Sequence, residues 1–129
     1  MSVQQIIGFI GLGIMGGPMA HHLRKAGHPV FTHTRSKTPD YLQEAGVLLC
    51  ANAVEVAQKA DIIFLMLPDT PDVEQVLFGA HGVAQGLSKG KIVVDMSSIS
   101  PIATKEFAQR ICSMGCEYLD APEIGRAHV

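Results

Sequence analysis

The chain has 129 residues, of which 47% are hydrophobic and 17% charged, and its formal net charge is −2. This length allows one domain with a sizeable core, and the composition is typical of a folded globular protein rather than a disordered one. The charge balance excludes a strongly basic nucleic-acid or anionic-membrane surface. The apolar stretch 6–19 has no basic segment before it and contains Pro18, so it predicts neither a signal peptide nor a membrane span.

The cysteine content indicates a reducing compartment. The chain carries Cys50, Cys112 and Cys116, and an odd number makes a poor disulfide framework. A cytoplasmic location is therefore the expectation. Cys112 and Cys116 have the spacing of a ligand pair, but no second pair or nearby histidine supports zinc, so no metal site is predicted.

Taken in chain order, apolar runs and helical spacing predict strands and helices that alternate. The predicted elements are a strand at 6–10, a helix at 15–25, a strand at 30–33, a helix at 38–45, a strand at 47–50, a helix at 54–59, a strand at 61–67, a helix at 71–78, a strand at 91–95, a helix at 101–114 and a strand beginning at 117–119. Gly27 and Gly46 end the first two helices, while Pro71 and Pro101 suit the first turns of the last two. Strands that are apolar on both faces predict a doubly wound α/β fold, a parallel sheet with helices on both faces.

A glycine motif lies between the first strand and the first helix. Gly11 permits a tight turn, Gly13 lets a pyrophosphate approach the backbone, and Gly16 lets the helix pack against the strand. The free amides at the helix start then face the phosphates. The predicted phosphate-binding residues are Gly11, Leu12, Gly13, Ile14, Met15 and Gly16. A structural turn that binds nothing is the alternative.

The end of the second strand favours NADP over NAD. An NAD site usually has an acidic residue there for the ribose hydroxyls, but the stretch 32–37 contains none. Arg35 can hold a 2′-phosphate by charge-assisted hydrogen bonds, and Thr34 and Ser36 add hydroxyl donors. His33 is a candidate to contact the adenine or the 2′-phosphate, and a partly exposed residue with no role in binding is the alternative. A solvated basic loop is the alternative for the whole stretch.

The ends of the fourth and fifth strands are expected to line the same crevice, because carboxyl ends of parallel strands meet at one edge of the sheet. Leu67 can lie against the adenine or the nicotinamide ribose, and Pro68 stiffens the turn. Ser97 and Ser98 can offer hydroxyls to the nicotinamide end. Capping of the following helix is an equally good interpretation of the serines. Asp69 and Asp72 are interpreted as acids of a helix N-terminus.

These motifs together resemble the β-hydroxyacid dehydrogenase family. Residues 9–20, FIGLGIMGGPMA, look like its N-terminal motif, and residues 34–36 stand where the family often has Asn-Arg-Thr. Residues 66–68 and 95–98 match its later cofactor contacts, with Ser98 at a position where relatives commonly have a cofactor-binding Thr or Ser. The resemblance runs from about residue 6 to residue 122. It implies a Rossmann-type domain that binds NADP, with NAD as the alternative cofactor.

Within the family, two stretches are most similar to the members that reduce tartronate semialdehyde (2-hydroxy-3-oxopropionate) to D-glycerate. They are residues 67–79 and 95–102. The resemblance thus implies hydride transfer between NADP(H) and a small 3-hydroxy acid or semialdehyde, and a homo-oligomer when the protein is full length. A 3-hydroxyisobutyrate dehydrogenase or related reductase is one alternative. A non-catalytic nucleotide-binding module is an alternative of another class.

The resemblance stops after Pro122. Relatives continue with Val-Ser-Gly-Gly, and their catalytic Lys and all-helical second domain lie farther on, so no catalytic residue is expected in this chain. Residues 1–122 are predicted to form the NADP-binding domain. The tail 123–129 contains IGRAHV, which a common short-read sequencing adapter would encode, and we expect this segment to be non-native. A naturally truncated protein is the alternative.

Overall fold

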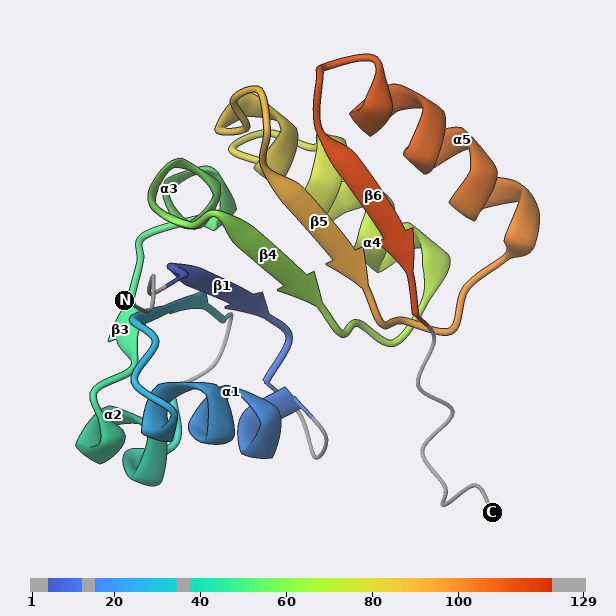
Figure 1. The fold of residues 1–129 in the computed structure, drawn as a ribbon. Coiled ribbons are helices and arrows are strands. Elements are labelled where there is room, and N and C mark those ends of the chain that lie inside the picture. Colours follow the sequence, from blue (N-terminus) through green and yellow to red (C-terminus); the bar gives the residue numbers. More distant parts are fainter. Residues whose placement is uncertain (1–4, 13–15, 35–37, 122–129) are drawn as a thin grey trace.

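A parallel sheet forms the centre of the molecule (Figure 1). This computed structural model describes residues 5–12, 16–34 and 38–121, so the predicted tail at 123–129 lies outside it. The strands are β1 (Ile7–Ile10), β2 (Val30–His33), β3 (Leu48–Leu49), β4 (Ile62–Leu65), β5 (Ile92–Asp95) and β6 (Glu117–Asp120). They pair in parallel in the order β3-β2-β1-β4-β5-β6. The strand order reverses between β1 and β4, which is the arrangement of a doubly wound fold.

Side-chain caps mark the starts of some of the helices. They are α1 (Gly16–Lys25), α2 (Asp40–Ala45), α3 (Ala53–Lys59), α4 (Thr70–Phe78) and α5 (Pro101–Cys112), with a short 3-10 helix η1 (Val83–Gln85). Asn52 Oδ1 accepts a hydrogen bond from the Glu55 amide at 3.0 Å, and Ser100 Oγ accepts one from Ala103 at 3.4 Å. Both side chains satisfy amides that have no partner within the helix. None of the described helices is long and apolar enough to cross a membrane.

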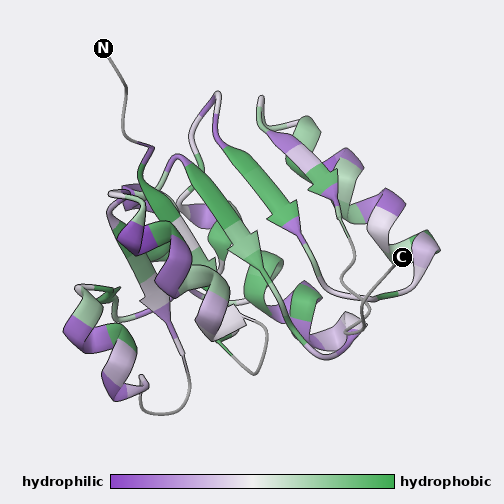
Figure 2. Cartoon of the chain, turned by 60° about the horizontal axis from the view of Figure 1, so that its bottom comes forward, coloured by the Kyte–Doolittle hydropathy of each residue, from purple (hydrophilic) through white to green (hydrophobic). Residues whose placement is uncertain are grey.

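Helices cover both faces of the sheet, as the apolar strands predict. Phe9, Val30 and Leu42 belong to a core cluster on the side of α1 and α2. Ile63 and Leu77 belong to a larger cluster on the side of α3, α4 and α5. Figure 2 shows hydrophobic strands between helices that also carry hydrophilic residues. The fold class expected from the sequence is thereby confirmed.

Several details differ from the sequence prediction, and strand β4 and helix α5 are shorter than the predicted 61–67 and 101–114. Helix α2 begins at Asp40 rather than at residue 38, because Pro39 has an extended backbone with ψ of 143°. Strand β3 has only two residues, and Leu48 and Leu49 are exposed because this strand lies at the edge of the sheet. The 3-10 helix η1 was not predicted, since its three residues carry no periodic apolar signal.

Candidate functional site

The turn after β1 has a conformation and surroundings that only glycine suits. Gly11 has φ of +95°, and a Cβ atom there would lie 2.0 Å from the carbonyl oxygen of Met66. A Cβ atom on Gly16 would lie 2.1 Å from the carbonyl oxygen of Gly11. The tight turn at Gly11 and the close helix packing at Gly16 therefore occur as predicted. Gly13, Ile14 and Met15 lie outside the described residues.

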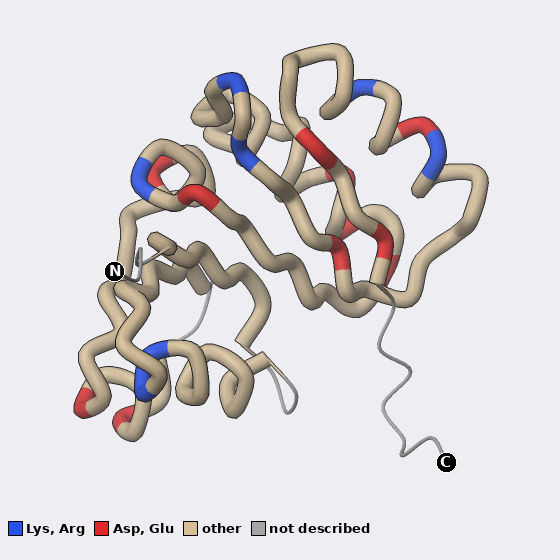
Figure 3. Tube along the Cα trace, viewed as in Figure 1, with Lys and Arg blue, Asp and Glu red and all other residues tan. Residues whose placement is uncertain are grey.

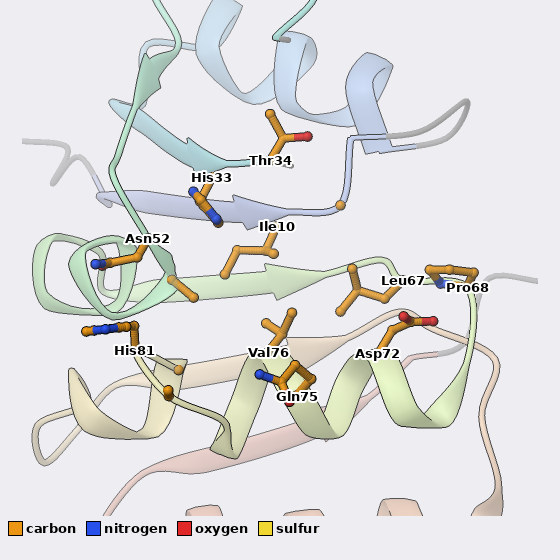
Figure 4. A pocket seen from close by; sticks show the side chains of 14 residues that line it. Ile10, His33, Thr34, Asn52, Leu67, Pro68, Asp72, Gln75, Val76 and His81 are labelled. Carbon is orange, nitrogen blue, oxygen red and sulfur yellow. The ribbon is translucent and has the colours of Figure 1, made fainter. Parts of the chain in front are cut away.

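A cavity of about 450 Å³ opens at the carboxyl ends of β1, β2 and β4. One part of its wall comes from Gly11 after β1, from His33 and Thr34 at the end of β2, and from Leu67 and Pro68 after β4. In Figure 4 these residues gather from separate strands around one hollow. Four predicted site residues thus lie together, and they come from three segments of the chain.

The opposite part of the wall comes largely from α4. Asp72, Gln75 and Val76 line the cavity (Figure 4), and their spacing of three and four residues places them on one face of the helix. Asn52 and His81 line its far end. No sequence motif marks these residues as part of a site, and Asp72 is expected only as an acid of the helix start. The helical spacing indicates that the three α4 residues share a face, but it does not indicate that this face lines a cavity.

His33 is held in place by the chain that follows β3. Its Nδ1 lies 3.3 Å from the Cys50 carbonyl oxygen, which can only accept a hydrogen bond, so Nδ1 carries the hydrogen. The Cys50 thiol is buried, and burial together with the nearby Glu55 carboxylate raises the pKa of Cys50 to about 11. This thiol therefore stays protonated at neutral pH, and the neutral group belongs to the core cluster that includes Ile10 and Ala53.

Three further predicted site residues, Leu12, Ser97 and Ser98, do not line the cavity. Ser97 is only 2% exposed, and its Oγ accepts a hydrogen bond from the Leu67 amide at 2.8 Å. Ser98 is exposed at the end of β5, and Leu12 packs against the core cluster next to α1. Arg35 and Ser36 lie outside the described residues. Contacts of all these residues with a cofactor remain predictions.

The cavity has the size, lining and place of a nucleotide site. Ligand pockets typically measure about 300–1,000 Å³ and combine apolar walls with a few polar groups. Here Ile10, Leu67 and Val76 are apolar, whereas Thr34 and Asn52 are polar. Within the part of the chain that is described, no group of three or more His, Cys, Asp or Glu residues could hold a metal ion. In doubly wound sheets ligands bind where the strand order reverses, which is the position of this cavity between β1 and β4.

The fold and this site define a dinucleotide-binding domain of the Rossmann type. Comparison with known proteins agrees: the family model for the NAD binding domain of 6-phosphogluconate dehydrogenase matches residues 6–127. The chain belongs to this family.

Similar proteins are named oxidoreductases. The chain is 51% identical over 119 residues to 2-hydroxy-3-oxopropionate reductase of Escherichia coli (strain K12), covering 92% of this chain and 41% of the reductase. It is 39% identical over 128 residues to the mitochondrial 3-hydroxyisobutyrate dehydrogenase of Mus musculus, covering 97% of this chain and 38% of that protein. A solved structure of Psf3 in complex with NADP+ and 2-OPP aligns with a TM-score of 0.80 and 29% identity, over 88% of this chain and 40% of Psf3.

The chain spans about two fifths of the length of the curated relatives it matches. The family model describes the matching residues 6–127 as an NAD binding domain. The predicted resemblance, the Rossmann-type fold and the assignment to an NAD(P)-dependent oxidoreductase family are confirmed.

Proposed function

We propose that this chain is the NADP-binding part of an oxidoreductase that transfers hydride between NADP(H) and a small 3-hydroxy acid or semialdehyde. The observation that carries the proposal is that the glycine turn after β1 opens onto a cavity at the reversal of strand order. In the complete enzyme the substrate is tartronate semialdehyde, and the product is D-glycerate. The 51% identity to 2-hydroxy-3-oxopropionate reductase supports this choice of substrate.

The residues of this chain bind and orient the cofactor. Leu67 and Val76 would offer apolar surface to the adenosine, and the amides at the start of α1 would bind the diphosphate. Arg35, with Thr34 and Ser36, holds the 2′-phosphate. The nicotinamide, when bound, supplies or accepts the hydride. We assign no catalytic acid to this chain, so the proton that carbonyl reduction requires comes from a residue outside it.

Cofactor choice is tested by thermal shift and by titration of the 129-residue chain with NADPH and with NADH. We expect NADPH to stabilise the protein more than NADH. Arg35→Ala is expected to weaken NADPH binding about tenfold, the loss of one charge-assisted hydrogen-bonded contact, and to leave NADH binding unchanged. Lys25→Ala, which removes an exposed cation at the end of α1, is the matched control and should change neither. Stronger stabilisation by NADH would contradict the role of Arg35.

The substrate is tested with the enzyme expressed from the complete gene. We expect kcat/KM for tartronate semialdehyde with NADPH to exceed that for the semialdehyde of 3-hydroxyisobutyrate by at least about tenfold. The second substrate has a methyl group where the first has a hydroxyl, and polar groups of a pocket that hydrogen-bonds the hydroxyl are left unpaired against a methyl. The reverse order would assign the protein to the 3-hydroxyisobutyrate dehydrogenases, of which the Mus musculus enzyme is a relative. Tight NADPH binding without turnover of any such substrate would indicate a nucleotide-binding module instead.

A further inference from the structure

A buried carboxylate lies at the end of β5, next to the cavity. Asp95 is 0% exposed and belongs to the sheet face covered by α3, α4 and α5. Its Oδ2 accepts a hydrogen bond from the hydroxyl of Tyr118 on β6, and its Oδ1 accepts one from the Ser97 amide at 2.9 Å. Acidic residues mark the carboxyl ends of both β5 and β6 in Figure 3. Burying a carboxylate is costly unless both oxygens are satisfied, and here each oxygen has a donor.

The hydrogen bonds continue from Asp95 to the wall of the cavity. The bond from the Ser97 amide to Asp95 closes a turn two residues long, a conformation that aspartate favours. This turn buries Ser97 and presents its Oγ to the Leu67 amide, 2.8 Å away. Leu67 is itself part of the cavity wall. A chain of contacts thus runs from β6 through β5 to the turn after β4.

Tyr118 is suited to be a permanent donor at the far end of this chain. It is only 9% exposed, and burial together with the hydrogen bond to Asp95 raises the pKa of its phenol. The hydroxyl therefore keeps its hydrogen and points it at Asp95 throughout the physiological pH range. Asparagine at position 95 can keep its oxygen toward the Ser97 amide only if its NH2 group faces Tyr118, and the Tyr118 hydroxyl must then accept a hydrogen bond instead of donating one.

We propose that Tyr118 and Asp95 are positioning residues of the cofactor pocket, which fix Ser97 so that its hydroxyl holds Leu67 in the pocket wall. The inference rests on the proposed function, since it assigns the pocket to a dinucleotide. Neither residue lines the cavity, so both act through Ser97 and Leu67. Their effect on binding is transmitted by the geometry of the turn after β4.

The test compares Tyr118→Phe, Asp95→Asn and Ser97→Ala with the wild-type chain. Two quantities are measured: the hydrogen-exchange rate of the Leu67 amide by NMR, and the Kd for NADPH by fluorescence titration. We expect the exchange rate of the Leu67 amide to be about tenfold higher than the loss of global stability alone would give. We expect the Kd for NADPH to rise about tenfold, which is the effect of one lost hydrogen bond. Tyr118→Phe removes a single oxygen and keeps the ring, so it serves if Asp95→Asn does not fold.

Thr32→Val is the matched control for a purely structural effect. Thr32 is 0% exposed, and its hydroxyl donates to the Phe9 carbonyl oxygen at 2.6 Å, but it belongs to the core face on the side of α1 and has no link to Leu67. It should lower stability without specifically accelerating Leu67 exchange. If Tyr118→Phe and Asp95→Asn resemble this control in both measurements, the proposal is overturned. If the wild type takes up no NADPH, the proposed function fails, whereas Leu67 exchange still reports whether the hydrogen-bond chain holds the turn.

Discussion

Gly11→Ala is expected to lower the free energy of unfolding by about 3 kcal/mol or more and to abolish measurable NADPH binding. Two effects add at this position. The backbone has φ of +95°, where a residue with a side chain is strained, and the new methyl carbon would lie 2.0 Å from the Met66 carbonyl oxygen. Because that oxygen belongs to the backbone at the end of β4, it cannot rotate away. The turn after β1 must therefore move, and with it the cavity that it borders.

Gly90→Ala separates the two effects. Gly90 has the same φ of +95°, but a Cβ atom there would meet nothing within 4 Å. Only the backbone strain remains, and we expect a cost of about 1 kcal/mol with NADPH binding intact. Urea denaturation followed by circular dichroism measures both variants. If Gly11→Ala and Gly90→Ala lose equal stability, the close contact between the turn after β1 and the end of β4 does not itself require glycine at position 11.

The fold could be predicted from the sequence because its signals are local and repeated. The runs at 6–10, 61–67 and 91–95 are apolar at successive central positions, which indicates strands buried on both faces. The structure places them as the neighbours β1, β4 and β5. Gly46 ends α2 with φ of +99°, as its position after the helical pattern predicts. Local propensity and tertiary packing agree at these places, so a single pattern is sufficient.

The edges of the elements depend on information that periodicity does not carry. Leu48 and Leu49 form a short, exposed strand, although their apolar signal is the same as that of a buried strand. The order of strands in the sheet, which the signal does not contain, places β3 at the edge. The extended ψ angle of Pro39 makes α2 begin at Asp40, and a pattern of helix propensity over several residues does not show the angle of one residue. Such boundaries are set by neighbours far away in the sequence.

The candidate site was predictable on the strand side and not on the helix side. The glycine turn and the residues after β2 and β4 carry motifs, and Gly11, Thr34, Leu67 and Pro68 line one cavity. The residues of α4 carry only helical periodicity, which does not say which face meets a ligand. Ser97 also follows a strand, where a cofactor contact and capping of the next helix are equally good interpretations, and in the structure its hydroxyl accepts a hydrogen bond from the Leu67 amide. A strand-end hydroxyl alone does not distinguish these roles.

Val76→Trp is expected to weaken NADPH binding on the order of a hundredfold, about 2.7 kcal/mol, while the protein stays folded. Val76 is half-buried, and its side chain points into the cavity between Ile10 and Leu67 in Figure 4. An indole at this position would occupy the space that we assign to the adenosine. The ring extends into an existing hollow, so the core under α4 does not have to expand, in contrast to an over-packed buried site.

Glu74→Trp is the control on the same helix. Glu74 is exposed and does not line the cavity, so the same side chain there adds apolar surface without filling the pocket. Fluorescence titration with NADPH and thermal unfolding of both variants separate binding from stability. If Val76→Trp binds NADPH as tightly as Glu74→Trp does, the cavity between β1, β4 and α4 is not the adenosine site. A hundredfold loss confined to Val76→Trp would place the nucleotide against the α4 wall, the part of the site that no sequence motif marks.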